Sequence, residues 1–326
     1  MRRVAMLAFE DVQVLDVTAP LEVFSLATRL AGGSYALELV ASGPIVTSSG
    51  LHLQPHRSLG ERLGSLDTLI VAGGRGVHAA AADDDLIDWV RAAAAGARRV
   101  ASVCTGAFLL ARAGLLDGRR ATTHWAECDR LAADYPEVEV DPQPIFVRDG
   151  HVYTSAGVTA GIDLALALVE EDLGGHASQV VARQLVVYMR RPGAQAQMSA
   201  GLAGQACAVP LLRELQDWIA EHLDADLSVP ALAERAFMSP RHFARVFKQE
   251  VGATPGSYVE AVRVERARTL LATTDLQLAE IARRCGFGTV ETLRRTFGRH
   301  TQRSPAEYRR ETAVAPVIPI TRSTAA

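Results

Sequence analysis

One stretch decides the fold: residues 98–114 read RRVASVCTGAFLLARAG. Small and β-branched residues predict a short buried strand over Arg99–Val103, and the apolar run from Ala107 predicts a helix that Gly114 ends. The three residues between them, Cys104-Thr105-Gly106, therefore form an abrupt turn. A side chain on such a turn stands at the carboxyl edge of a parallel sheet, with the free N–H groups of the helix beneath it.

Cys104 has two interpretations on these residues alone. Helix N–H groups stabilise a thiolate, so a cysteine at this turn is expected to have a lowered pKa and to be reactive. A small buried cysteine that only packs against its neighbours fits the same pattern.

Composition indicates a globular chain with two domains. It has 326 residues, a formal net charge of −3 and 48% hydrophobic residues, which is enough for two cores. Its four cysteines show no CxxC spacing, so we expect no metal, no disulfide framework and no cofactor. The six apolar residues before Glu10 are too few for a signal peptide, and no apolar run approaches the eighteen residues of a membrane span. We therefore expect a cytoplasmic protein with no membrane partner.

Charge is divided unequally along the chain. Residues 235–310 carry 15 Lys and Arg against 7 Asp and Glu, whereas the rest of the chain carries 19 basic and 30 acidic residues. A basic module on an acidic body predicts a polyanionic partner for that module alone.

Strands and helices alternate over residues 1–189. This alternation predicts a doubly wound, flavodoxin-like α/β sheet, which binds ligands beyond the carboxyl ends of its strands. Asp16, the Gly73-Gly74 pair and Cys104 each fall beyond the end of a predicted strand. The predicted strands cover residues 3–8, 34–41, 67–71, 99–103 and 151–155, and further helices are predicted over residues 19–30, 86–95 and 159–171.

Three segments of this domain resemble one superfamily. They are SVCTGAFLLARAGLLDGRRATTHW (residues 102–125), DVTAPLEVF (residues 16–24) and AGGRG (residues 72–76). They resemble the class I glutamine amidotransferase-like superfamily, in the branch of the Pfp-type intracellular proteases and isonitrile hydratases. The resemblance implies an effector pocket around an elbow cysteine. Its candidate residues are Cys104 and Thr105 at the elbow, Asp16 near the sulfur, Gly73 and Gly74 as a nest of backbone N–H groups for an anion, and His124.

Each of these residues also has a structural interpretation. The glycine pair is typical of a tight turn, a single histidine is usually structural, and Asp16 suits the N-cap of a helix that starts near Ala19. Together they favour a pocket, but a cysteine hydrolase also needs a base within reach of its sulfur and a third group that orients the base. Asp16 is one methylene shorter than the glutamate common in the family, so the pocket resembles the hydratase-like members more than the proteases.

Residues 190–210 have the composition of a linker. They begin RRPGAQAQ and continue with small residues interrupted by glycine. RRPGAQAQ also resembles the sequence that commonly follows this kind of sensor domain in regulators. We therefore predict a first domain over residues 1–189, a second over residues 211–310 and a disordered tail over residues 311–326.

The second domain is helical throughout. A short helix, a turn and a longer helix occur twice, about 50 residues apart, joined by one long helix over residues 256–271. Ser239-Pro240, Thr254-Pro255 and Ser304-Pro305 are each typical of a helix start. A single unit of this kind is most simply a helical hairpin with a basic face. Two copies favour a pair of helix-turn-helix units that address adjacent segments of the DNA major groove.

Two segments of this domain resemble the AraC/XylS transcription regulators. They are MSPRHFARVFKQEVGATPGSYVEAVRVERARTLL (residues 238–271) and IARRCGFGTVETLRRTFGRHTQRSPAEYRR (residues 281–310). The match assigns side chains to bases and to phosphates, and the chemistry agrees, since Arg pairs with guanine and Glu accepts from cytosine. The base-facing candidates are Arg241, Ala244, Arg245, Val290, Glu291, Thr292 and Arg295, and the phosphate candidates are Lys248, Arg294, Arg299 and Arg303.

Two functions of different classes follow. The first is a transcription regulator whose first domain senses an amino-acid-like or amine-like metabolite and forms a homodimer, while its second domain binds double-stranded promoter DNA. RNA polymerase is a further candidate partner. The second function is a cysteine-dependent hydratase or amidase with an appended helical domain. No hydrolase needs two basic helix-turn-helix units, so the regulator is favoured and no catalytic residue is assigned. A regulator with residual chemistry at Cys104 stays open.

Overall fold

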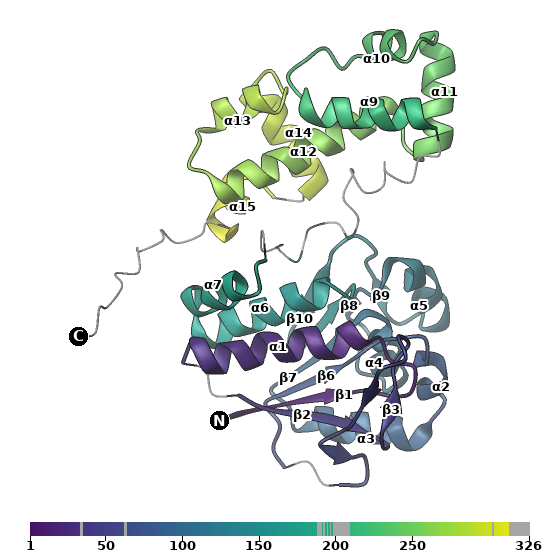
Figure 1. Cartoon of the computed structure of the whole chain (residues 1–326), viewed down its shortest axis with the longest axis vertical. Coiled ribbons are helices and arrows are strands. Elements are labelled where there is room, and N and C mark those ends of the chain that lie inside the picture. Colours follow the sequence, from purple (N-terminus) through teal and green to yellow (C-terminus); the bar gives the residue numbers. More distant parts are fainter. Residues whose placement is uncertain are drawn as a thin grey trace, which may run out of the picture. The chain divides into compact units, whose positions relative to one another are not determined.

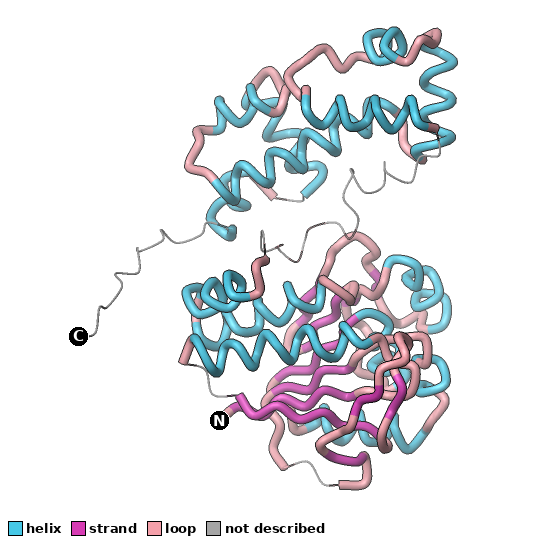
Figure 2. The backbone as a smooth tube through the Cα atoms, in the orientation of Figure 1, coloured by secondary structure: helices cyan, strands magenta, loops and turns pink. Residues whose placement is uncertain are grey.

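The chain folds into two compact units, Met1–Gln197 and Met198–Ala326. The computed structural model describes residues 1–32, 35–61, 64–187, 191, 193, 195, 197, 209–301 and 303–312. The first unit combines strands and helices, and the second is helical (Figures 1 and 2). Each unit has apolar clusters of its own.

A seven-stranded sheet forms the centre of the α/β unit. Its strands lie in the order β10-β11-β7-β6-β1-β2-β5, and all neighbours are parallel except β10 and β11. Strands β6, β7 and β11 are buried along their whole length, as expected for a sheet covered on both faces. The bounds are β1 Arg2–Leu7, β2 Tyr35–Ala41, β5 Arg57–Ser58, β6 Thr68–Val71, β7 Arg99–Val103, β10 Phe146–Asp149 and β11 Val152–Ser155.

Helices cover both faces of this sheet (Figure 2). Helices α1, α6 and α7 pack against one another, and α2, α3 and α4 form a second group. Two short strand pairs, β3 with β4 and β8 with β9, stand outside the main sheet. The bounds are α1 Val14–Leu30, β3 Ile45–Val46, β4 His52–Leu53, α2 Val77–Ala81, α3 Asp84–Ala95, α4 Ala107–Arg112, β8 Arg120–Ala121, α5 Cys128–Asp134, β9 Glu139–Val140, α6 Ala160–Leu173 and α7 Gly175–Gln184, with single 3₁₀ turns at Cys104–Gly106 and Trp125–Glu127.

The predicted α/β fold is confirmed, with one helix start wrong. All five predicted strands are present, and their ends differ from the prediction by one residue at most. Helix α1 begins at Val14 rather than near Ala19. The prediction missed this start because the N-cap, Gln13, makes no side-chain hydrogen bond, and because Pro20 lies inside the helix. Pro20 imitates the proline that often begins a helix. Asp16 therefore lies within the first turn of α1 and is not its N-cap.

Helix α12 connects the two halves of the helical unit. Its first half packs into one apolar cluster through Val259 and Val262, and its second half packs into another through Ala267 and Leu270. The bounds are α9 Pro210–Glu221, α10 Val229–Arg235, α11 Pro240–Val251, α12 Pro255–Thr273, α13 Leu278–Arg284, α14 Val290–Thr301 and α15 Pro305–Thr312.

Both helix-turn-helix units occur where they were predicted. Helices α10 and α11 form the first, and α13 and α14 form the second. The Ser239 hydroxyl accepts a hydrogen bond from the His242 N–H at the start of α11, and Thr289 accepts one from the Thr292 N–H at the start of α14. These hydroxyls satisfy N–H groups that a helix start otherwise leaves unpaired.

The α/β unit extends beyond the predicted boundary at residue 189. Arg191, Gly193, Gln195 and Gln197 belong to this unit and form hydrogen bonds with it. The composition of a linker did not reveal this docking, because it depends largely on main-chain groups that every residue has. Except for residues 209 and 210, the remainder of the predicted linker lies outside the described residues. Of the predicted tail, only residues 311 and 312 of α15 are described.

Candidate functional site

Cys104 occupies a strained turn between β7 and α4. Its φ is +56°, in the left-handed region that residues with a side chain rarely adopt. Two glycines bring other backbone segments close to it. A Cβ on Gly157 would lie 2.1 Å from the Cys104 Cβ, and one on Gly73 would lie 2.8 Å from the same atom. Gly157 carries no sequence signal of this contact, because it is a lone glycine in a loop distant along the chain.

Asp16 reaches the elbow from the first turn of α1. Its side chain is fully buried, and Oδ1 accepts a 2.7 Å hydrogen bond from the Val158 N–H. Oδ2 is buried with no hydrogen-bond partner in the described part of the chain. Burial raises the pKa of Asp16 to about 6, although the Val158 N–H, the Cys104 side chain and the Gly73 N–H each lower it. Asp16, Gly73 and Cys104 thus lie together.

The Cys104 side chain is a thiol in this environment. It is 7% exposed, and burial raises the pKa of the Cys104 thiol well above its usual range. The charge of Asp16 raises this pKa further, while the Thr105 N–H lowers it. The expectation that helix N–H groups depress the pKa of Cys104 is therefore wrong, because desolvation outweighs them.

The glycine pair contacts both Thr105 and Asp16. The Gly74 N–H donates to Thr105 Oγ1 at 2.9 Å, and the same hydroxyl donates to the Gly74 carbonyl at 3.1 Å. The Gly73 N–H is directed to Asp16, where it lowers the pKa of that carboxyl. The Gly74 N–H is therefore engaged by Thr105 at the elbow and is not free for an anion.

His124 acts locally as a helix cap. Its Nδ1 accepts a 3.4 Å hydrogen bond from the Ala126 N–H and begins the 3₁₀ turn that follows. Burial lowers the pKa of His124. The preceding residue connects this segment to the elbow, because Thr123 Oγ1 donates to the Cys104 carbonyl at 2.8 Å. The structure thus gives His124 a structural role, and gives Thr123 a contact with the elbow that the sequence did not indicate.

These residues suit recognition of a small polar group better than nucleophilic attack. A nucleophilic cysteine acts as a thiolate, which burial and Asp16 both oppose here. A carboxyl whose pKa is near 6 can donate or accept a hydrogen bond around neutral pH, and its Oδ2 is available. Across the described ranges, no cluster of His, Cys, Asp and Glu suits a metal ion.

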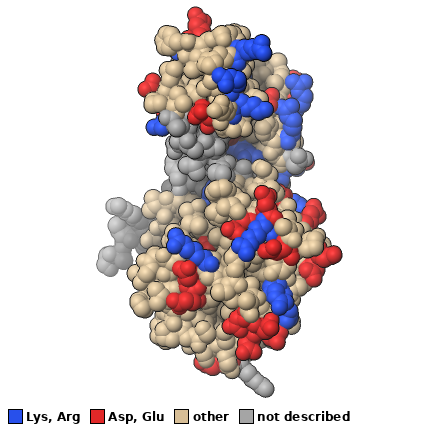
Figure 3. All heavy atoms as spheres, turned by 90° about the vertical axis from the view of Figure 1, so that its right-hand side faces the viewer, with Lys and Arg blue, Asp and Glu red and all other residues tan. Residues whose placement is uncertain are grey.

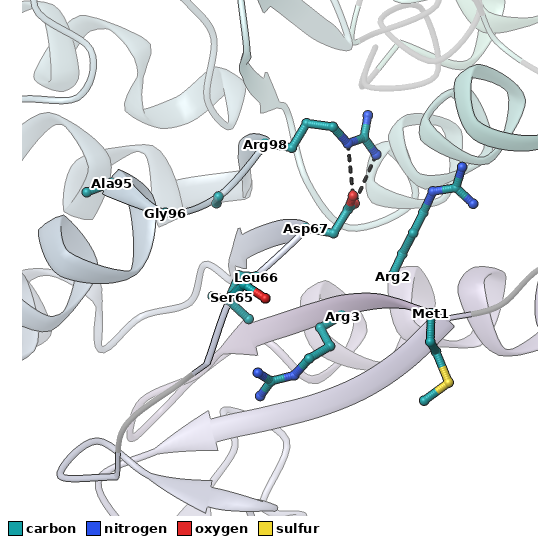
Figure 4. Close-up of a pocket in the computed structure, with 10 residues that line it drawn as sticks. Met1, Arg2, Arg3, Ser65, Leu66, Asp67, Ala95, Gly96 and Arg98 are labelled. Atoms are coloured by element: carbon teal, nitrogen blue, oxygen red, sulfur yellow. Dashed lines mark hydrogen bonds and ion pairs between the residues drawn. The ribbon is translucent and has the colours of Figure 1, made fainter.

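A cavity of about 650 Å³ lies at the other edge of the sheet, at the amino ends of β1, β6 and β7. Figure 4 shows Arg98 extended over Asp67, with both hydrogen bonds drawn. Arg98 also contacts Asp172 at 2.8 Å, and Arg3 contacts Glu38 at 2.9 Å. Because these cations are already neutralised, the cavity carries no assignment as an anion site.

The outer faces of α11 and α14 present the candidate DNA contacts. Figure 3 shows Lys and Arg side chains on the helical unit, while Asp and Glu are more frequent on the α/β unit. Most of the cationic candidates are exposed, whereas Ala244, Val290, Thr292 and Arg303 are half-buried. Val290 packs against the apolar cluster that contains Ala267 and Leu270. The exposed candidates are Arg241, Arg245, Lys248, Glu291, Arg294, Arg295 and Arg299.

Several of these side chains form ion pairs or hydrogen bonds on their own surface. Arg294 lies 3.7 Å from Glu291 within α14, and Arg299 lies 2.6 Å from Glu260 of α12. Arg245 is 3.3 Å from the His242 ring. Exposed pairs of this kind are weak, so a phosphate can compete for these cations.

Comparison with known proteins identifies relatives of both units. Residues 2–171 match the DJ-1/PfpI family, and residues 232–311 match a helix-turn-helix domain family. The chain is 30% identical over 302 residues to the HTH-type transcriptional regulator CdhR of Pseudomonas aeruginosa, across 91% of this chain and 88% of that protein. It is 28% identical over 317 residues to the HTH-type transcriptional regulator GlxA of Rhizobium meliloti, across 95% of this chain and 96% of that protein.

An enzyme is similar to part of the chain. The isonitrile hydratase of Pseudomonas putida is 41% identical over 184 residues, across 56% of this chain and 77% of that protein. Among solved structures, a THiJ/PfpI family protein from Pseudomonas syringae has a TM-score of 0.54 and 26% identity, across 72% of this chain and 88% of that one. The regulators are thus similar to this chain across both units, whereas the similarity to the hydratase is limited to the α/β unit. No helix in the described part of the chain is long and apolar enough to cross a membrane.

Proposed function

Because this chain belongs to the DJ-1/PfpI family and to the HTH-type transcriptional regulators that carry such a domain, we propose that it binds promoter DNA under the control of a small molecule. The observation that carries the proposal is the pair of capped helices, α11 and α14, mounted on one connecting helix with arginines on their outer faces. Paired reading helices of this kind address two segments of the major groove.

In this proposal the two helices divide the work of recognition. Arg241 and Arg245 of α11 and Arg295 of α14 meet base edges, where arginine pairs bidentately with guanine. The exposed Glu291 accepts from cytosine once it leaves Arg294. Lys248, Arg294, Arg299 and Arg303 meet phosphates, which set affinity rather than sequence preference.

The effector binds at Asp16 and Cys104. The buried Oδ2 of Asp16 has no hydrogen-bond partner among the residues described, so it favours a ligand with an N–H or O–H donor. An amino-acid-like or amine-like molecule supplies that group. The Gly74 N–H is not free for a carboxylate, because it already donates to Thr105 Oγ1. The amine is therefore the better supported part of this ligand class.

We further propose that Cys104 performs no turnover. A buried thiol beside an acid is a poor nucleophile, which supports sensing. The second candidate is a hydratase activity of the α/β unit, which its 41% identity to the isonitrile hydratase favours. Cys104→Ser separates the two: we expect it to leave DNA binding intact. Turnover of an isonitrile that disappears in this variant would instead establish the enzyme.

A transcription regulator also interacts with further partners. We propose a homodimer formed through the α/β unit, contact with RNA polymerase at the promoter, and action in the cytoplasm, where bacterial promoters are found. A dimer with two reading helices in each protomer contacts four groove segments, which increases both affinity and specificity.

The decisive experiment is selection of bound DNA from a random pool by the full-length protein. We expect a motif of two parts about one helical turn apart, with affinity that falls steeply as salt rises. Arg130→Ala, on the exposed face of the α/β unit, is the matched control and should retain the motif. Failure to enrich any sequence, or affinity that salt does not change, would refute the DNA-binding function.

A further inference from the structure

Four alternate residues of the predicted linker form a docked segment, which we call the clasp: Arg191, Gly193, Gln195 and Gln197. Three main-chain hydrogen bonds hold it beside β10, the edge strand of the sheet. The Phe146 N–H donates to the Gly193 carbonyl at 3.3 Å, the Ile145 N–H donates to the Gln195 carbonyl at 2.8 Å, and the Gln197 N–H donates to the Gln143 carbonyl at 2.9 Å. Docking of this kind satisfies the exposed hydrogen-bonding groups of a sheet edge.

Side chains anchor both ends of the clasp. The Arg191 main-chain N–H donates to Asp163 Oδ1 at 2.9 Å, and its guanidinium donates to Oδ2 at 2.9 and 2.6 Å and to Thr159 Oγ1 at 3.0 Å. Asp163 is only 6% exposed. At the other end, Gln197 Nε2 lies 3.1 Å from Thr122 Oγ1, 2.9 Å from the Thr123 carbonyl and 3.3 Å from the Pro144 carbonyl.

Each anchor contacts a segment that also contacts Asp16 or Cys104, the proposed effector site. Thr123, beside Gln197, donates to the Cys104 carbonyl. Thr159, beside Arg191, follows Val158, whose N–H donates to Asp16. Cys104 and Asp16 are thus each connected to one end of the clasp through a single intervening segment.

We propose that the clasp transmits occupancy of the Asp16–Cys104 pocket to the DNA-binding unit by docking and releasing. This inference rests on the proposed function. A ligand that displaces Thr123 or Val158 changes the hydrogen bonds at one end of the clasp, so it binds the docked and released states with different affinity.

Release changes the length of chain between the units. With the clasp docked, the eleven residues 198–208 connect it to Val209, and eleven residues span about 40 Å at most. With the clasp released, residues 188–208 connect Val187 to Val209, a span of up to about 70 Å. The clasp therefore sets how widely the DNA-binding unit can range.

Two variants open the clasp and one serves as a control. A Cβ on Gly193 would lie 2.6 Å from the Phe146 ring and 2.8 Å from the Phe146 carbonyl oxygen, so Gly193→Ala cannot dock unchanged. Gln197→Ala removes the three bonds of Nε2. Gln195 contributes its main-chain carbonyl, so Gln195→Ala should dock normally.

The test uses the full chain and two readouts that need no effector and no DNA. Hydrogen exchange of the Ile145 and Phe146 amides reports docking, and the rate at which iodoacetamide labels Cys104, mapped by mass spectrometry, reports the elbow. We expect Gly193→Ala and Gln197→Ala to exchange at least about tenfold faster and to label at least about threefold faster. Gln195→Ala should stay within about twofold of the wild type, and circular dichroism should show that all variants are folded.

A reciprocal measurement completes the test, because coupling between two sites acts in both directions. Wild-type protein carbamidomethylated at Cys104 should exchange the same two amides faster. Faster exchange in the variants with unchanged Cys104 labelling would overturn the proposal, because the clasp would then be only a support. Unchanged exchange in Gly193→Ala would overturn it as well, because the segment would not depend on this contact.

Affinity for the selected DNA tests the output. We expect Gly193→Ala to change the dissociation constant of the full chain at least about threefold, and Gln195→Ala to leave it unchanged. Altered labelling without altered affinity would overturn transmission to the second unit. A wild-type protein that selects no DNA would refute the proposed function, whereas the labelling and exchange rates would still decide whether the clasp senses the pocket.

Discussion

The elbow around Asp16 and Cys104 and the reading helices, α11 and α14, use opposite physical means. At the elbow, Asp16 and Cys104 are buried, the turn is strained, and neighbouring backbone leaves no room for a methyl group at Gly157. On the reading helices, Arg241, Arg245 and Arg295 are exposed. Burial makes each polar contact strong and costly to disturb, whereas exposed contacts are weak and nearly independent. Changes in the pocket should therefore act on folding, and changes on the helices should act on DNA.

The largest effect is expected at Gly157. An added methyl group would meet Cys104 at 2.1 Å and would also be strained at φ +86°, so Gly157→Ala should lower the free energy of unfolding by about 4 kcal/mol. Gly118→Ala is the matched control, because Gly118 has φ +68° with nothing within 4 Å of a Cβ. It should cost only about 1 kcal/mol. Urea denaturation measures both. Equal losses would mean that the elbow is not tightly packed, and the contrast between the regions would fail.

Asp16 should give the stability of the elbow a pH dependence that the exposed surface lacks. Folding raises the pKa of Asp16 from 3.8 to about 6, so the native state holds the proton more firmly and stability falls as pH rises through this window. The shift corresponds to about 3 kcal/mol. Asp16→Asn does not titrate, so its stability relative to the wild type should rise by about that amount between pH 4 and pH 7.

Denaturation curves at several pH values measure this difference. Asp129→Asn, at an exposed position of α5, is the control and should follow the wild type. A relative stability of Asp16→Asn that does not change with pH would show that the carboxyl is not held in its protonated form.

Arginines of the reading helices should affect DNA binding without affecting folding. Arg245→Ala and Arg295→Ala should each cost about 1–3 kcal/mol of specific binding and relax one base preference. Lys248→Ala, a candidate phosphate contact, should weaken selected and scrambled DNA alike and reduce the salt dependence. Titration of both DNAs separates these results. Equal losses on scrambled DNA for the two arginines would reassign them to phosphates.

The smallest effects are expected at the helix caps. Ser239→Ala and Thr289→Ala each remove a hydroxyl that accepts a backbone hydrogen bond, so each should cost about 1 kcal/mol of stability in the helical unit. Scanning calorimetry of the full chain measures the change, with Ser65→Ala at an exposed position of the α/β unit as the control. A loss as large as that at Gly157 would show that the helical unit is as tightly constrained as the elbow.

The features that could be predicted from the sequence are those that short segments of the chain determine. The elbow strand and helix, the caps at Ser239 and Thr254 and the two repeated units all depend on neighbours a few residues apart. The start of α1 was misplaced for a local reason as well, since Pro20 has the appearance of a proline at a helix start but lies inside α1. Local signals are informative but not always unambiguous.

Contacts between distant segments could not be predicted from one sequence. Val158 lies 142 residues after Asp16, and nothing in either segment announces the hydrogen bond between them. The direction of the Cys104 pKa was missed for the same reason, because it depends on total burial rather than on the turn. The docking of residues 191–197 was hidden because main-chain hydrogen bonds leave no mark on composition.

One unbroken helix, α12, separates the two reading helices, and this limits how a binding site can evolve. Its nineteen residues form a rod of about 28 Å, anchored in a different apolar cluster at each end. A single base pair inserted between the two contacted segments would rotate one segment by about 35° relative to the helix that contacts it, since DNA completes a turn in about ten base pairs. A rigid rod cannot follow that rotation. Binding sites for such a protein can therefore diversify by base substitution, whereas the spacing between their two contacted segments must stay constant.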